Sequence, residues 1–117
     1  MEKAELVAKA LDDKKGTDIV ILDVGEKTSI ADKFVICSCT SSTQVKACAD
    51  NAEELLSEAG EDVHHVEGYS AGNWVLLDFG DVIVHVFGKE GAEFYRFERL
   101  FKPEAFLPVD DVQENDE

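Results

Sequence analysis

Asp78 and His85 are the two side chains of this sequence that come closest to an acid–base pair. Both lie in an apolar run from Trp74 to Phe87 that Gly80-Asp81 interrupts. If Gly80-Asp81 is the two-residue turn of a β-hairpin, the carboxylate and the imidazole share one face at near-diagonal positions, where they can interact. A catalytic pair would also need a nucleophile, and no Ser or Cys stands beside them in the hairpin. We therefore expect structural pairing, or orientation of His85 by Asp78, in preference to catalysis.

The cysteines Cys37, Cys39 and Cys48 raise the question of a metal site. Cys37 and Cys39 are two residues apart on a predicted strand and therefore share a face. A closed zinc site needs about four ligands in a recognisable spacing, whereas the adjacent His64 and His65 would point to opposite faces of a strand. With an odd number of cysteines and no export signal, we expect free thiols, no metal site and no cofactor.

The segment Thr40-Ser41-Ser42 follows a predicted strand and precedes a predicted helix, which is the geometry of an anion site. Nucleotidyl transfer would also need two carboxylates that converge on a metal ion, and no Asp-x-Asp stands on a predicted strand. Asp78-Phe79-Gly80 matches the metal-binding tripeptide of protein kinases by chance, because the other kinase motifs are missing. We expect Ser41 to be a helix N-cap, with Gln44 at capping-box spacing.

These residues must be positioned by a single α/β domain with a mixed β-sheet of about five strands flanked by helices. The apolar runs 19–24 and 34–39 are typical of central strands that are buried on both faces, and the polar segment 63–67 is typical of an edge strand. Residues 1–108 are expected to form the domain and residues 109–117 an acidic, disordered tail. The expected helices cover 3–14, 42–59 and 90–101, and the expected strands cover 19–24, 34–39, 63–67, 74–79 and 82–87.

The hairpin from Trp74 to Phe87 is apolar on both faces, which is more than a core-covering hairpin needs. One face is expected in the core, and the other carries a Trp and polar groups in the manner of a protein interface hot spot. Cover by a helix of the same chain is the alternative, and composition leaves the two equally open. The first face holds Val75, Leu77, Phe79, Val82, Val84 and Val86, and the second holds Trp74, Leu76, Asp78, Ile83, His85 and Phe87.

The chain has 117 residues and a formal net charge of -15, from 26 acidic and 11 basic side chains. This charge argues against direct binding to nucleic acid, because phosphates would be repelled. It fits a basic protein partner, and solubility alone is the other explanation. The sequence has no apolar run of the roughly 20 residues that span a bilayer and no secretory pattern, so we expect a cytoplasmic protein with no membrane partner.

Several segments together resemble the ribosomal silencing factor family, also called RsfS or Iojap-like proteins. The resemblance runs from about Leu22 to Phe101, and the hairpin is its most specific part. The family often has Arg at position 43, where this chain has Thr43, and Trp near position 101, where this chain has Phe101. The matching segments are Leu22-Asp23-Val24, Ala31-Asp32-Lys33-Phe34-Val35-Ile36, Ser41-Ser42-Thr43-Gln44-Val45, Ala49-Asp50, Glu67-Gly68, Trp74 to Val82, Val84-His85-Val86-Phe87 and Phe94 to Phe101.

The resemblance implies a nucleotidyltransferase-like fold without the catalytic carboxylates, and hence no enzyme. It also implies a homodimeric translational repressor that binds the large ribosomal subunit through ribosomal protein uL14 and blocks the small subunit when nutrients are scarce. The residues that match family positions, and that we expect to contact the partner, are Trp74, Leu76, Asp78, His85, Tyr95 and Glu98. The alternatives are a nucleotide-binding or nucleotidyltransferase-type enzyme and a dimeric scaffold without a ribosomal partner.

Overall fold

Among the described residues, seven helices and strands follow one another in the order expected for an α/β domain. The computed structural model describes residues 2–26, 29 and 31–88. The helix predicted over 90–101 and the tail predicted over 109–117 lie outside these residues, so both stay predictions. The elements are α1 (Lys3–Asp13), β1 (Thr17–Asp23), β2 (Lys33–Ser38), α2 (Ser42–Glu58), β3 (His65–Glu67), β4 (Trp74–Asp78) and β5 (Val82–Phe87).

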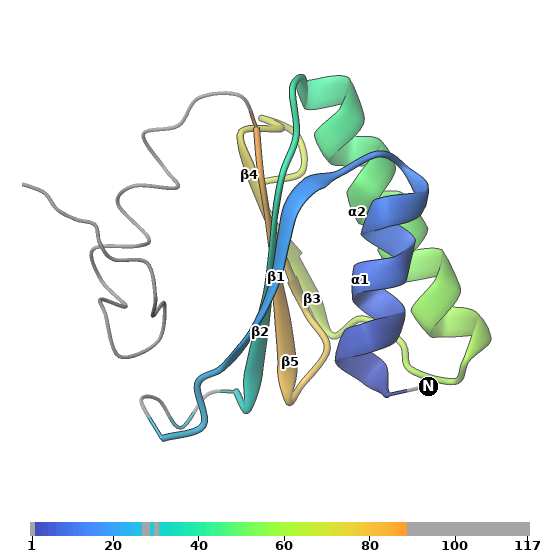
Figure 1. The fold of residues 1–117 in the computed structure, drawn as a ribbon. Coiled ribbons are helices and arrows are strands. Elements are labelled where there is room, and N and C mark those ends of the chain that lie inside the picture. Colours follow the sequence, from blue (N-terminus) through green and yellow to red (C-terminus); the bar gives the residue numbers. More distant parts are fainter. Residues whose placement is uncertain (1, 27–28, 30, 89–117) are drawn as a thin grey trace, which may run out of the picture.

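The five strands form one mixed sheet in the order β1-β2-β5-β4-β3, which confirms the predicted fold class. β2 and β5 are parallel, and the other neighbouring pairs are antiparallel. Parallel neighbours cannot be joined by a tight turn, and here the connection runs through α2, β3 and β4. Figure 1 shows α1 and α2 lying side by side on one face of this sheet.

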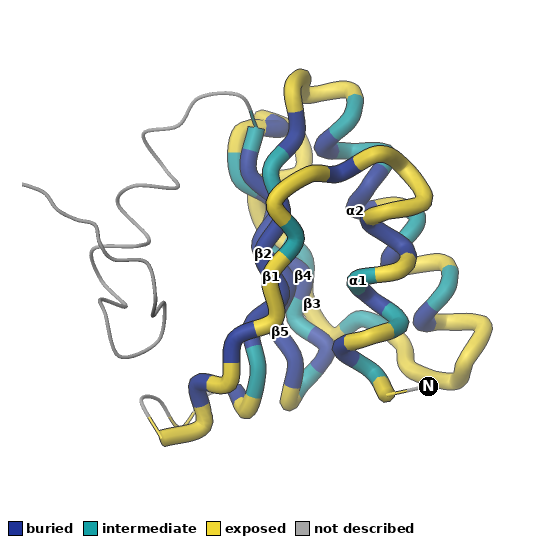
Figure 2. The backbone as a smooth tube through the Cα atoms, in the orientation of Figure 1, coloured by how far each residue is buried: buried dark blue, intermediate teal, exposed yellow. Residues whose placement is uncertain are grey.

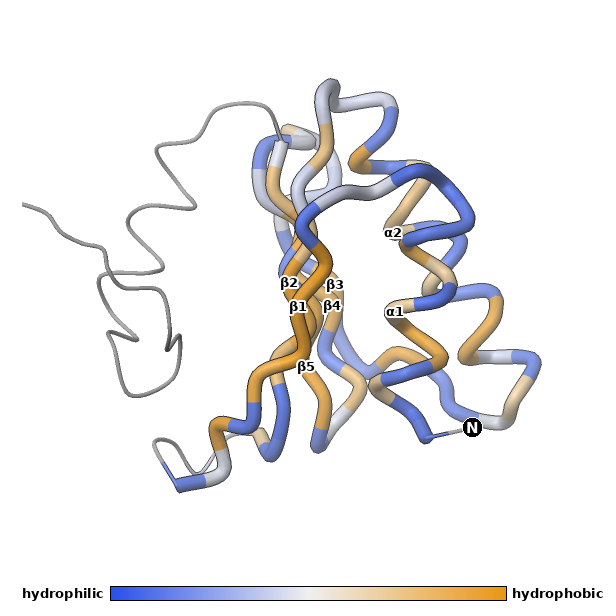
Figure 3. The backbone as a smooth tube through the Cα atoms, viewed as in Figure 1, coloured by the Kyte–Doolittle hydropathy of each residue, from blue (hydrophilic) through white to orange (hydrophobic). Residues whose placement is uncertain are grey.

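β1 differs from the prediction, because it lies at an edge of the sheet and not at its centre. Val20 and Ile21 are each 40% exposed, and Figure 2 shows exposed residues along much of β1. Figure 3 shows hydrophobic residues along β1 as along its neighbour β2, so hydropathy alone does not separate an edge strand from a central one. The pairing of β1 with β2 also shifts register between Thr17 and Val20, where Asp18 has a φ of 52°. The predictions of a buried β2 and of an edge position for β3 are confirmed.

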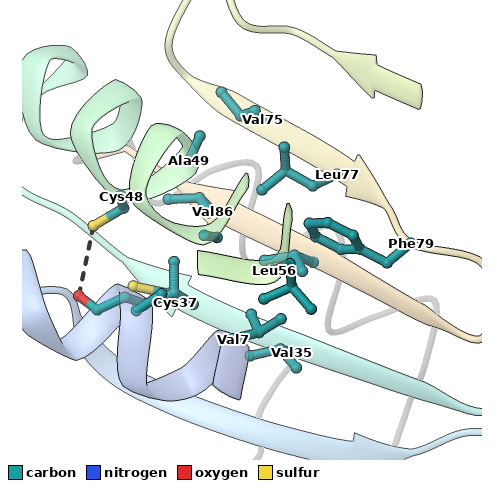
Figure 4. Packing of buried hydrophobic residues seen from close by; sticks show 14 of the residues in the cluster. Val7, Val35, Cys37, Cys48, Ala49, Leu56, Val75, Leu77, Phe79 and Val86 are labelled. Atoms are coloured by element: carbon teal, nitrogen blue, oxygen red, sulfur yellow. Dashed lines mark hydrogen bonds between the residues drawn. The ribbon is translucent and has the colours of Figure 1, made fainter. Parts of the chain in front are cut away.

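The larger core, which we call the helix-side core, fills the space between the two helices and the sheet (Figure 4). Val7 of α1, Leu56 of α2 and Leu77 of β4 are fully buried in it. Burial of each such side chain stabilises the fold by roughly 1.5–3 kcal/mol. The hairpin contributes the whole face that the sequence assigned to the core, namely Val75, Leu77, Phe79, Val82, Val84 and Val86.

The start of α2 is capped as predicted and is also tied to the chain that follows α1. The Ser41 hydroxyl accepts a hydrogen bond from the Gln44 backbone N–H at 3.1 Å. The Gln44 side-chain oxygen accepts from the Thr40 N–H at 2.8 Å, and its amide donates to the Lys14 and Lys15 carbonyls at 3.2 and 2.9 Å. Ser41 therefore acts as an N-cap. The polar side chains at this helix start, Ser41 and Gln44, already make hydrogen bonds within the chain.

Candidate functional site

The hairpin turn has the geometry that the sequence predicted, and this sets which residues share a face. The Phe79 N–H donates to the Val82 carbonyl at 2.9 Å, and Asp78 pairs with Ile83. Gly80 has a φ of 94°, a conformation that side chains disfavour, and its N–H donates to the Asp78 carboxylate at 2.8 Å. The division of the hairpin into two faces is therefore confirmed.

Three of the predicted contact residues, Trp74, Leu76 and Asp78, lie in line on one face of β4, and we call them the hairpin patch. All three are half-buried, so part of each side chain reaches the surface. Trp74 and Leu76 pack against a second, smaller cluster on the sheet face opposite α1 and α2. The buried members of that cluster are Leu22, Val24, Ala31, Phe34, Ile36, Ile83 and Phe87.

Trp74 is oriented by contacts with β5. Its indole N–H donates to His85 Nδ1 at 3.1 Å, and its ring lies 5.1 Å from that of Phe87, centroid to centroid. A tryptophan held in this way has lost much of its rotamer freedom before any partner arrives, which lowers the entropy cost of binding. The hairpin patch is therefore a partly preorganised surface with an aromatic, an aliphatic and a carboxylate group.

His85 has a different environment from the one that we expected. Its ring is only 4% exposed and lies edge-on to Phe34, with centroids 4.8 Å apart. Burial lowers the pKa of His85 to about 4, so the imidazole is neutral at pH 7. Because Nδ1 accepts the indole hydrogen bond, the proton of the neutral ring is on Nε2. Within this chain His85 positions Trp74, and the prediction that its ring contacts a partner stays untested.

The expected pairing of Asp78 with His85 is not the arrangement that the structure shows. Leu76 is the direct neighbour of His85 across the strands, and the Asp78 carboxylate turns toward the backbone of Gly80. A short polar side chain beside a turn can hydrogen-bond the backbone two residues on, and that local partner prevails here. Asp78 fixes the turn, and Trp74 is the partner of His85.

An ion pair fastens the tip of the hairpin to α1. The Lys3 ammonium lies 2.7 Å from an Asp81 carboxylate oxygen and 3.2 Å from one of Glu61, and it donates to the Phe79 carbonyl at 3.1 Å. The hydrogen bond to Asp81 raises the pKa of Lys3 and lowers that of Asp81. The first turn of α1 thus holds the turn that presents the hairpin patch.

Tyr95 and Glu98, the other two predicted contact residues, lie outside the described residues. Their assignment to a partner surface stays a prediction.

The structure brings Cys48 against Cys37 and Cys39, which the sequence analysis had placed on one strand face without it. Cys37, Cys39 and Cys48 are buried, and their three Sγ atoms all lie within 4.8 Å of one another. Within residues 2–26, 29 and 31–88 this is the one group of three or more potential metal ligands. The signal was present in the sequence, because Cys48 lies on the apolar stripe of a helix that must cover a sheet face.

The carboxylates of the described residues form no cluster of three or more that could hold a metal ion. No helix among the described residues is long and apolar enough to cross a membrane.

Comparison with known proteins identifies the family. The model of the family described as "Ribosomal silencing factor during starvation" matches residues 1–117. The chain belongs to the ribosomal silencing factor family. An RsfS protein of Haemophilus influenzae is 41% identical over 101 residues, which cover 86% of this chain and 99% of that protein. An RsfS protein of Halalkalibacterium halodurans is 40% identical over 100 residues, which cover 86% of each chain.

A solved structure supports the same assignment at the level of the fold. The crystal structure of a Chromobacterium violaceum protein superposes with a TM-score of 0.81 at 37% identity, and covers 95% of this chain and 98% of that chain. The single α/β domain with its five-stranded mixed sheet is therefore the RsfS fold. RsfS proteins are ribosome-binding regulators.

Proposed function

We propose that this chain binds the large ribosomal subunit through ribosomal protein uL14 and sterically blocks the small subunit, which represses translation when nutrients are limiting. The match of the ribosomal silencing factor model to residues 1–117 carries the proposal. The protein acts in this view by occupying a surface and catalyses no reaction. Because ribosomes are its target, we place it in the cytoplasm.

The hairpin patch is the part of the described surface that best suits this role. Trp74 supplies an aromatic anchor, Leu76 adds apolar area beside it, and both are half-buried. Aromatic side chains in preorganised positions are the residues that dominate the free energy of protein interfaces. Asp78 would accept hydrogen bonds from a Lys or Arg of the partner through the part of its carboxylate that the turn does not use.

The charge of the chain supports a basic protein surface as the target. A net charge of -15 attracts a basic ribosomal protein and opposes direct contact with ribosomal RNA. Complementary charge mainly accelerates encounter and orients the partners, while the apolar anchor supplies affinity. Binding is therefore expected to weaken with salt but to persist through the aromatic contact.

A sucrose-gradient experiment with purified subunits tests the proposal. The protein is added to large subunits, then small subunits are added at a magnesium concentration that permits joining. We expect the protein to travel with the large subunit and the yield of joined ribosomes to fall as its concentration rises. Migration with small subunits, or an unchanged yield at saturating protein, would contradict the proposal.

The contact with uL14 and the homodimer need separate measurements. Cross-linking from a photoreactive residue at position 76 should label uL14 among the large-subunit proteins, and labelling of another protein in its place would refute the assignment of this partner. Sedimentation velocity over a range of concentrations should show a dimer. A monomer throughout that range would remove the homodimer from the proposal and leave the ribosome contact standing.

A further inference from the structure

Cys37, Cys39 and Cys48, which we call the cysteine cluster, lie in the helix-side core, whereas the hairpin patch lies on the opposite face of the sheet. Cys37 is on β2, Cys39 directly follows that strand, and Cys48 faces them from α2. Their exposed fractions are 0%, 4% and 0%. The Cys39 and Cys48 sulfurs are 3.5 Å apart, and Figure 4 shows Cys37 and Cys48 on the facing elements.

Three sulfurs at these separations suit the coordination sphere of a small, soft metal ion. A zinc–thiolate bond is about 2.3 Å long, and three sulfurs around one ion at that distance lie about 4 Å apart. The observed spacing, from 3.5 Å to at most 4.8 Å, brackets that value.

The number of ligands distinguishes between the soft metals. Structural zinc sites take four protein ligands, and the grouped ligands in the described part of this chain number three. Cu(I) prefers thiolate sulfur, and because its charge is only +1 it binds two or three such ligands without a fourth. The enclosure of the cluster also keeps water and oxygen away, and this favours the lower oxidation state of copper.

We propose that Cys37, Cys39 and Cys48 form a binding site for one Cu(I) ion held by three sulfurs between β2 and α2. Each sulfur that binds gives up its proton to solvent, so binding releases protons and copper stays in the +1 state. No electron is transferred and no bond other than S–H is broken.

The turn between α1 and β1 encloses the cluster. Gly16 is buried against it, and a Cβ at this position would overlap the Cys37 sulfur. The Cys48 thiol also donates a long hydrogen bond to the Leu11 carbonyl at 3.8 Å (Figure 4). Lys15 on this turn has a φ of 70°, in the left-handed region.

The test is a competition titration of the reduced full chain with Cu(I) and the chromogenic ligand bicinchoninate in the absence of oxygen. We expect one equivalent of Cu(I) to be withheld from bicinchoninate. X-ray absorption at the copper edge should show three sulfur neighbours. Failure to withhold copper, or a shell of two or four sulfurs, would overturn the proposal.

Variants separate ligand loss from damage to the core. Cys37→Ser, Cys39→Ser and Cys48→Ser should each weaken Cu(I) binding by more than about 100-fold, which exceeds the usual cost of losing an outer-shell contact. The matched control is Ala49→Ser, which puts a hydroxyl into the same core and keeps all three sulfurs. An equal loss of copper in the control would overturn the proposal. The proposal would also be overturned if the reduced chain bound no Cu(I) and mild peroxide instead produced a Cys39–Cys48 disulfide.

Discussion

The two faces of the β4–β5 hairpin differ in what their side chains do. Leu77 points into the helix-side core and is fully buried, while its neighbour Leu76 points to the other face and is half-buried. The helix-side face is aliphatic except for Phe79, whereas the opposite face carries Trp74, Asp78 and His85. Because side chains alternate along a strand, one short segment can stabilise the fold and present a binding surface.

The face that carries Trp74 accommodates two polar side chains, Asp78 and His85, among apolar ones. The Asp78 carboxylate accepts a hydrogen bond from the Gly80 N–H, and His85 Nδ1 accepts one from the Trp74 indole N–H, both within the hairpin. These bonds remove part of the cost of burying polar atoms and fix the orientation of the patch. The helix-side face needs no such bonds, and its contribution is to packing.

The largest expected effect is a difference in stability between substitutions of Leu77 and of Leu76. Leu77→Ala leaves a cavity in the helix-side core and should lower the free energy of unfolding by about 2–5 kcal/mol. Leu76→Ala removes a half-exposed side chain and should cost less than about 1.5 kcal/mol, yet it should weaken binding to the large subunit. Urea denaturation measures the first quantity and co-sedimentation the second. Equal destabilisation by both substitutions would break the comparison.

Trp74→Ala tests the anchor of the hairpin patch. We expect binding to the large subunit to weaken by on the order of 2 kcal/mol or more, with the circular dichroism spectrum unchanged. The matched control is Tyr69→Ala, which removes an exposed aromatic ring whose hydroxyl bonds to Asp50 of α2. Co-sedimentation that is unaffected by Trp74→Ala, or reduced as much by Tyr69→Ala, would exclude Trp74 as the anchor.

His85 should make the free energy of unfolding depend on pH. The unfolded chain binds a proton at His85 near pH 6.5, whereas burial lowers the pKa to about 4 in the folded chain. The contribution is therefore complete above pH 6.5 and is lost as the pH falls toward 4. Between pH 7 and pH 5 the free energy of unfolding should therefore fall by about 2 kcal/mol on account of His85.

The measurement compares the free energy of unfolding of wild type and His85→Gln at these two pH values. The difference between pH 7 and pH 5 should be smaller in His85→Gln by that amount. An unchanged difference in His85→Gln would show that the ring is not protected by the fold.

Asp78→Asn should have the smallest effect, because it removes the charge and keeps an oxygen that can accept from the Gly80 N–H. We expect the affinity for the large subunit to fall by less than about 1 kcal/mol and the dependence of binding on salt to become shallower. Binding titrations at several salt concentrations measure both. A salt slope identical to wild type would argue that Asp78 faces no cation in the complex.

Local rules predicted those features whose partners are near in sequence. The two faces of the hairpin followed from period-two alternation and the Gly80 turn, and the Ser41 cap followed from its spacing to Gln44. The place of β1 in the sheet could not be predicted, since an apolar run such as 19–24 has the same sequence pattern in a central strand and in an edge strand. The apolar stripe of α2 directs Cys48 toward the sheet, but its approach to Cys39 depends on how α2 packs there, which local sequence does not determine.

The parallel pairing of β2 with β5 has a consequence for how the chain folds as it is synthesised. Lys33 pairs with Val82 and Ser38 with Phe87. The centre of the sheet therefore joins β2 to β5, which emerges from the ribosome much later during synthesis. Until β5 is available, β2 has a partner on one side only, and its other edge can pair with a foreign strand. Contacts of such long sequence separation slow folding. A protein that we propose to act on ribosomes is thus most exposed to misassembly while it is still attached to one.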